Sequence, residues 1–145
     1  METKPNLFFK NATWKVDHEF VSPAGVITPD TGEMSFKVTA NRILWKRRFI
    51  DDYGDNISLN YDIRKIDDLN YEYESDDIAE MGPQKGSIHV NRNRLYLTMQ
   101  IGNNPIKGFE VIICDGDIAY SYGALYYVNT LIKTWSATMT KVVDK

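Results

Sequence analysis

The strongest constraint on the fold is an alternation of apolar and polar side chains with a period of two residues. Trp14, Val16, His18 and Phe20 share one phase, and the residues between them are charged. Successive side chains of a β-strand point to opposite faces, so this pattern predicts strands with one apolar and one polar face. The pattern recurs nearly to the C-terminus, and we therefore expect an all-β chain.

About ten segments are predicted as strands. Their approximate ranges are 12–21, 33–40, 42–50, 57–64, 69–74, 86–91, 95–101, 109–113, 118–122 and 133–143. The Pro- and Gly-containing stretches 22–32 and 76–86 are predicted as longer loops. Residues 124–131 fit either a short helix, by apolar spacing, or another strand, by their Tyr and Val content.

The arrangement of these strands follows from their short connections. Consecutive strands joined by short turns are usually antiparallel neighbours, and a flat sheet this wide would leave two open edges and a bare apolar face. The chain is therefore predicted to be one domain, residues 1–145, forming an up-and-down antiparallel β-barrel of about 8–10 strands. A two-layer sandwich is the alternative. The first ten residues are expected to form an arm, with Leu7, Phe8 and Phe9 plugging one end.

Composition excludes several classes of function. The net charge of -3 and a single basic run at Lys46–Arg48 argue against nucleic acid as a partner. No stretch approaches the roughly 20 apolar residues of a membrane span, and no signal peptide is visible, which predicts a cytoplasmic location. The single cysteine, Cys114, excludes an internal disulfide and is expected to point outward and be inert. The two histidines do not converge, so no metal site is expected.

Polar residues in the apolar phase are the candidates for function. Arg47 lies between Trp45 and Phe49, and a buried guanidinium needs an anion, a carboxylate or water. A register shift at a bulge would instead turn Arg47 outward. The predicted ligand-binding residues are Arg47, His18, Trp45, Tyr61, Tyr71, Tyr73, Tyr120, Tyr122 and Phe36.

The layout resembles the calycin group, which comprises lipocalins, fatty-acid-binding proteins and their relatives. The matching features are Trp14 near the start of the first strand, a meander of strands, and Lys141 on a late strand. In that group the first-strand Trp packs across a barrel end beneath a late basic side chain. The resemblance implies a lipocalin-like barrel in which Arg and Tyr groups hold a ligand carboxylate.

Three functions remain open at this point. The first is binding of a small apolar or aromatic ligand, with an acidic head group at Arg47. The second is a lipocalin-like lyase or isomerase that uses Arg, Tyr and His groups, with His18 as the candidate catalytic base. The third is a packed barrel that acts as a protein-interaction module. No cofactor is expected, and haem bound through His18 is the one alternative.

Overall fold

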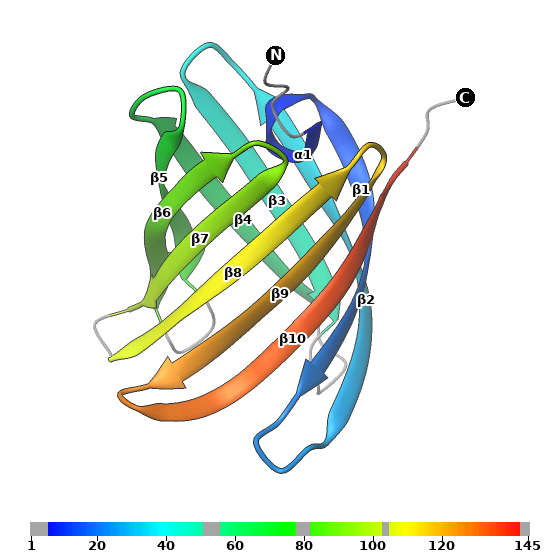
Figure 1. Ribbon diagram of the computed structural model, residues 1–145, viewed down its shortest axis with the longest axis vertical. Helices are drawn as coiled ribbons and strands as arrows, with labels where there is room; N and C mark the ends of the chain where they lie inside the picture. Colours follow the sequence, from blue (N-terminus) through cyan, green and yellow to red (C-terminus); the bar gives the residue numbers. More distant parts are fainter. Residues whose placement is uncertain (1–5, 51–55, 78–81, 103–104, 143–145) are drawn as a thin grey trace.

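The chain folds into a closed antiparallel β-barrel, here seen in a computed structural model that describes residues 6–50, 56–77, 82–102 and 105–142 (Figure 1). One short helix, α1 (Asn6–Phe9), precedes the strands. The strands are β1 (Ala12–Val21), β2 (Ile27–Val38), β3 (Arg42–Ile50), β4 (Asn56–Lys65), β5 (Asn70–Asp77), β6 (Pro83–Asn91), β7 (Arg94–Ile101), β8 (Ile106–Asp115), β9 (Ile118–Tyr127) and β10 (Thr130–Lys141).

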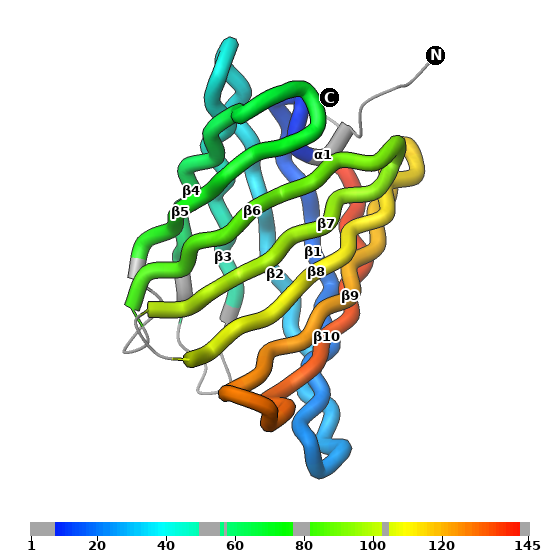
Figure 2. The backbone as a smooth tube through the Cα atoms, turned by 60° about the vertical axis from the view of Figure 1, so that its left-hand side comes forward, coloured from blue at the N-terminus to red at the C-terminus, as the bar shows by residue number. Residues whose placement is uncertain are grey.

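Every strand pairs with its neighbours in the sequence, and the first pairs with the last. The order around the barrel is β1-β10-β9-β8-β7-β6-β5-β4-β3-β2, which is an up-and-down meander (Figure 2). Trp14 lies directly across from Lys141 where β10 closes against β1. The predicted all-β, closed antiparallel barrel is confirmed. Closure pairs the first strand with the last, so the barrel has no open sheet edge.

One end of the barrel is closed by α1. Phe8 is buried and meets the rings of Phe36 and Trp45 edge-on, at centroid distances of 5.0 and 4.9 Å. The helix lies at the end where β1 begins and β10 finishes (Figure 1). The predicted plug is therefore present at Phe8, while the side chain of Leu7 lies outside the described part of the chain.

Both of the longer loops predicted from the sequence are shorter in the structure. The loop predicted over 76–86 is shortened because β5 runs to Asp77 and β6 begins at Pro83. Strand β2 begins at Ile27, so the loop predicted over 22–32 is shorter and Pro29 lies within a strand. Of the two alternatives for 124–131, the strand is confirmed and the helix is wrong, because β9 runs to Tyr127 and β10 begins at Thr130. The chain turns at Val128, whose φ of 55° is a left-handed conformation.

The inner and outer faces of β8 and β9 are opposite to those predicted. Phe109, Tyr120 and Tyr122 are exposed, whereas Glu110 and Ser121 are buried. Cys114, predicted to point outward, is also buried. The sequence pattern was misleading because β8 carries apolar residues in both phases and β9 carries its largest side chains on the outside.

The face that points inward on β8 is decided by its pairing with β7. Leu95 and Leu97 are buried and lie opposite Ile112 and Glu110. Residues directly opposite one another on paired strands share a face of the sheet. The even-numbered residues of β8 must therefore face the interior with the odd-numbered residues of β7.

Within the described residues, no helix is long and apolar enough to span a membrane.

Candidate functional site

The centre of the candidate site is a contact between Arg47 on β3 and His18 on β1. Arg47 Nη2 lies 3.3 Å from His18 Nε2, and the two strands are separated by β2. His18 is buried, and Arg47 is half-buried on the same inner face. The structure thus places Arg47 inside the barrel, without the register shift that would have turned it outward.

This contact fixes the protonation of the imidazole. A guanidinium has only donors, so His18 Nε2 must accept and the ring proton must sit on Nδ1. Burial, and next the charges of Arg47 and Lys133, lower the pKa of His18 to about 3. His18 is therefore neutral at pH 7, and its Nδ1–H is buried without a partner among the described residues.

The candidate catalytic and haem roles of His18 both need a ring nitrogen with an available lone pair. The Nε2 lone pair already faces Arg47 Nη2, and Nδ1 carries the proton. Either role at Nε2 would first require the guanidinium to move away. The arrangement favours His18 as a hydrogen-bond donor through Nδ1.

An aromatic wall supports the guanidinium. Arg47 lies 5.0 Å above the Trp45 ring, and Trp45 stacks on Tyr61 with centroids 4.5 Å apart. Burial by itself lowers the pKa of Arg47, but Tyr61 and Glu110 raise it, and the net pKa is above the ordinary value.

A chain of hydrogen bonds leads from this wall to the next strands. The Tyr61 hydroxyl donates to Gln84 Oε1 at 3.3 Å, and Gln84 Nε2 donates to the Tyr73 hydroxyl at 3.0 Å. Tyr73 in turn donates to the Thr98 carbonyl at 2.8 Å. Burial is the main cause of the raised pKa of both tyrosines, so they remain neutral donors at physiological pH.

A second polar cluster, missed by sequence reasoning, surrounds Glu110. Glu110 Oε2 accepts hydrogen bonds from Ser121 Oγ and from Trp135 Nε1, the latter at 3.1 Å. The carboxylate is only 3% exposed. The register of the β7–β8 hairpin places Glu110 opposite the buried Leu97. Working out that register from the sequence would have shown that Glu110 faces inward.

Several inward residues remain partly accessible at the end of the barrel away from α1. Phe20 and Lys133 contact each other, with the ammonium 4.7 Å from the ring centroid, and both are half-buried. Phe49 and Trp135 are also half-buried on the inner face. This region is therefore less tightly filled than the end that Phe8 closes.

Two of the predicted binding residues lie apart from the Arg47 cluster. Phe36 packs against Phe8 and Trp45 at the plugged end. Tyr71 is buried and contacts Phe9, with ring centroids 5.5 Å apart. The predicted residues that the structure brings together around the guanidinium are Arg47, His18, Trp45, Tyr61 and Tyr73.

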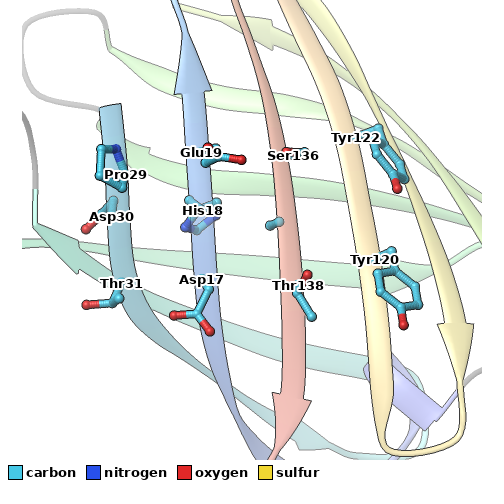
Figure 3. A pocket seen from close by; sticks show the side chains of 11 residues that line it. Asp17, His18, Glu19, Pro29, Asp30, Thr31, Tyr120, Tyr122, Ser136 and Thr138 are labelled. Carbon is cyan, nitrogen blue, oxygen red and sulfur yellow. The ribbon is translucent and has the colours of Figure 1, made fainter. Parts of the chain in front are cut away.

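Tyr120 and Tyr122 lie on the outside of the barrel, which corrects their prediction as interior residues. They border an open groove of about 830 Å³ that crosses β9, β10, β1 and β2 (Figure 3). Asp17 and Glu19 line the same groove from β1 (Figure 3). The phase is reversed because the inner positions of β9 hold small residues, Ser121 among them.

No group of three or more His, Cys, Asp or Glu side chains that could hold a metal ion occurs in the ranges that the structure describes.

The described strands form a closed ten-stranded antiparallel barrel whose inner wall combines an aromatic lining with charged and polar groups. Similar solved structures include Rv2717c from M. tuberculosis, with a TM-score of 0.71 and 13% identity over 92% of each chain. The phycobiliprotein lyase CPES from Guillardia theta is also similar, with a TM-score of 0.65 and 10% identity over 94% of this chain and 90% of that one. At such low sequence identity, these structural similarities show a shared fold alone.

No protein-family profile matches this chain. No curated protein matches its sequence either.

Proposed function

We propose that this protein binds a small apolar or aromatic molecule inside the barrel and holds its acidic group at Arg47. The observation that carries the proposal is the set of contacts made by the guanidinium. Arg47 faces the interior, yet its direct partners, His18 Nε2 and the Trp45 ring, are both neutral. A carboxylate is the natural partner for a guanidinium in such a position, because the two match in charge and in fork geometry.

Other groups near Arg47 suit the same ligand. The unpartnered His18 Nδ1–H can donate to an acidic or carbonyl oxygen. Phe20 and Phe49 are inward-facing aromatic side chains that remain half-buried, so an apolar ligand body can cover them. These half-buried rings favour a binding barrel over a packed interaction module, since a filled core would bury them completely.

The test compares an acidic ligand with its neutral ester. We expect the polyene fatty acid cis-parinaric acid, followed by its fluorescence, to bind the wild-type protein more tightly than its methyl ester. Arg47→Gln removes the charge, and the acid should then bind about 10- to 100-fold more weakly, because a hydrogen bond to a charged group contributes roughly 1.5–3 kcal/mol. Binding of the ester should change little.

Arg48→Gln is the matched control. Arg48 is the next residue of β3, points outward and pairs with Glu33 at 2.6 Å. Its replacement removes the same charge from the same strand and should leave acid binding unchanged. Equal losses from the two substitutions, or no loss from Arg47→Gln, would contradict the proposed site.

A lyase-type activity is the second candidate, and it too is a proposal. It is favoured by the neutral hydroxyls of Tyr61 and Tyr73 beside Arg47 and Glu110, groups that can stabilise or move charge on a bound substrate. One protein of the same fold is a phycobiliprotein lyase. Native mass spectrometry separates the candidates: a binding protein releases its co-purified molecule unchanged, whereas a lyase converts it on incubation.

A further inference from the structure

Glu110 differs from an ordinary buried carboxylate in how its two oxygens are used. Both hydrogen bonds, from Ser121 Oγ and Trp135 Nε1, reach the same oxygen, Oε2. Oε1 has no hydrogen-bond partner among the described residues. Oε1 is also not one of the fully buried polar atoms that lack a partner, so a molecule that enters the interior can reach it. A carboxylate oxygen can accept two hydrogen bonds, and Oε1 therefore remains available to a donor.

The orientation of the carboxylate is held by its neighbours. Ser121 and Trp135 bind one oxygen from β9 and β10, so the other oxygen is directed away from both donors. Gly123 makes this arrangement possible, because a Cβ there would lie 2.2 Å from Trp135 Cζ2. The indole can therefore rest against the backbone of β9 and still donate to Glu110.

Glu110 and Arg47 interact electrostatically without forming an ion pair. Hydrogen bonds lead from Tyr61 through Gln84 to Tyr73, and Tyr73 donates to the Thr98 carbonyl on β7, the strand that pairs with β8 and places Glu110 opposite Leu97. In agreement with this placement, the negative charge of Glu110 raises the pKa of Arg47, Tyr61 and Tyr73. Arg47 and Glu110 are nevertheless not within 4.0 Å of each other in the part of the chain described. Arg47 contacts the neutral His18 and Trp45, and Glu110 contacts the neutral Ser121 and Trp135. The interior therefore has a positive pole at Arg47 and a negative pole at Glu110 that do not form an ion pair.

We propose that these two poles are the two ends of one ligand site, with Glu110 Oε1 accepting a hydrogen bond from an N–H or O–H group of the ligand. This inference rests on the proposed binding of an acidic group at Arg47 and narrows the ligand class. The ligand is an aromatic or apolar acid that also carries a hydrogen-bond donor away from its acidic group. A plain fatty acid satisfies Arg47 and leaves Glu110 Oε1 without a partner.

The experiment uses pairs of ligands that differ by a single N–H group. Indole-3-acetic, indole-3-propionic and indole-3-butyric acids are each compared with their 1-methyl derivatives by titration calorimetry on the full-length protein. For at least one chain length, we expect the N–H acid to bind about tenfold or more tightly than its methylated partner, as for one hydrogen bond to a charged group. This comparison needs no variant and is independent of any folding defect.

Glu110→Gln then assigns the preference to the carboxylate. If the amide oxygen takes over the hydrogen bonds from Ser121 and Trp135, the amide nitrogen replaces Oε1 and meets the ligand as a donor. The preference for the N–H acid should disappear. Ser121→Ala is the control: it removes a donor from Oε2, leaves Oε1 in place, and should keep the preference.

The outcomes separate this inference from the function on which it rests. If each acid and its methylated partner bind equally, and both depend on Arg47, the role of Glu110 is overturned and the acid site stands. If no indole acid binds, or if indole-acid binding does not depend on Arg47, this inference is overturned. The proposed function is then decided separately, by whether cis-parinaric acid binds the wild-type protein more tightly than it binds Arg47→Gln. A preference that survives Glu110→Gln also overturns the inference.

Discussion

Arg47 Nη2 donates to His18 Nε2 across 3.3 Å, and this single contact defines the chemistry of the barrel interior. Burial, and next the charge of Arg47, keep the imidazole neutral, and the contact gives the inward guanidinium a partner that carries no negative charge. The positive charge therefore remains to be matched by an anion. Because protonation of His18 is unfavourable in the folded protein, we also expect the stability of the protein to fall at acidic pH.

The first prediction concerns that sensitivity. The pKa of His18 is about 3 in the folded protein and about 6.5 when unfolded, so between these values the unfolded chain binds more protons. The contribution of His18 to stability is complete above about pH 6.5 and is lost as the pH falls toward 3. Through His18, the free energy of unfolding changes by at most about 1.4 kcal/mol per pH unit in this range.

His18→Gln should remove this slope while the side-chain oxygen still accepts from Arg47. The measurement is the free energy of unfolding by urea between pH 7 and pH 4 for both proteins. His89→Gln is the control, because His89 is exposed on the outer face of β6. If the wild-type protein and His18→Gln lose stability in parallel, the buried neutral imidazole is not the cause.

The second prediction concerns the packing of Trp135 against β9. In Gly123→Ala the new methyl group would lie 2.2 Å from Trp135 Cζ2 and 2.7 Å from the Phe109 carbonyl oxygen. The indole must shift, and its hydrogen bond to Glu110 must break or lengthen. We expect a loss of about 1–3 kcal/mol in the free energy of unfolding, as for other overpacked sites.

A double substitution identifies the indole as the source of this loss. In a Trp135→Phe background the smaller ring leaves more room, so Gly123→Ala should cost less than it does in the wild-type protein. The close approach of the Phe109 carbonyl would remain and account for the rest. An identical cost in both backgrounds would show that the indole does not pack against Gly123.

The third prediction concerns Cys114, which is buried and directed into the barrel. A thiol reacts with a disulfide reagent only when the reagent reaches it. In native buffer, 5,5′-dithiobis(2-nitrobenzoic acid) should therefore modify Cys114 slowly, and the reaction should become fast and stoichiometric in denaturant. Rapid modification of the folded protein would place the thiol on the outer face instead.

The strands at the start of the chain were predictable because one phase is apolar and the other is charged. In β1 every second residue from Trp14 to His18 is buried, as the pattern indicates. Counting by twos from Trp45 and Phe49 offered an inward Arg47, but residues 42–50 carry apolar side chains in both phases, so a register shift that turns Arg47 outward stayed open. The structure decided between the two by pairing Arg47 with Met34 and Leu59.

The second half of the site could not be read in this way. In β8 both phases are apolar, so hydrophobicity does not distinguish Phe109 from its neighbours, and Glu110 resembles a solvent-exposed residue. In β9 the large tyrosine side chains favoured the wrong face as the inner one. Ser121 and Gly123 face inward, because only small residues fit beneath Trp135.

The sequence by itself determined that the chain is all-β, that its strands form an antiparallel meander, and which face points inward on the strands whose two faces differ clearly in polarity. Only the tertiary structure decided which faces of β8 and β9 point inward. Ile101 pairs with Ile106, so odd-numbered residues of β7 share a face with even-numbered residues of β8. Closure of the barrel extends this constraint to every strand, because a shift of one residue would turn a whole inner face outward.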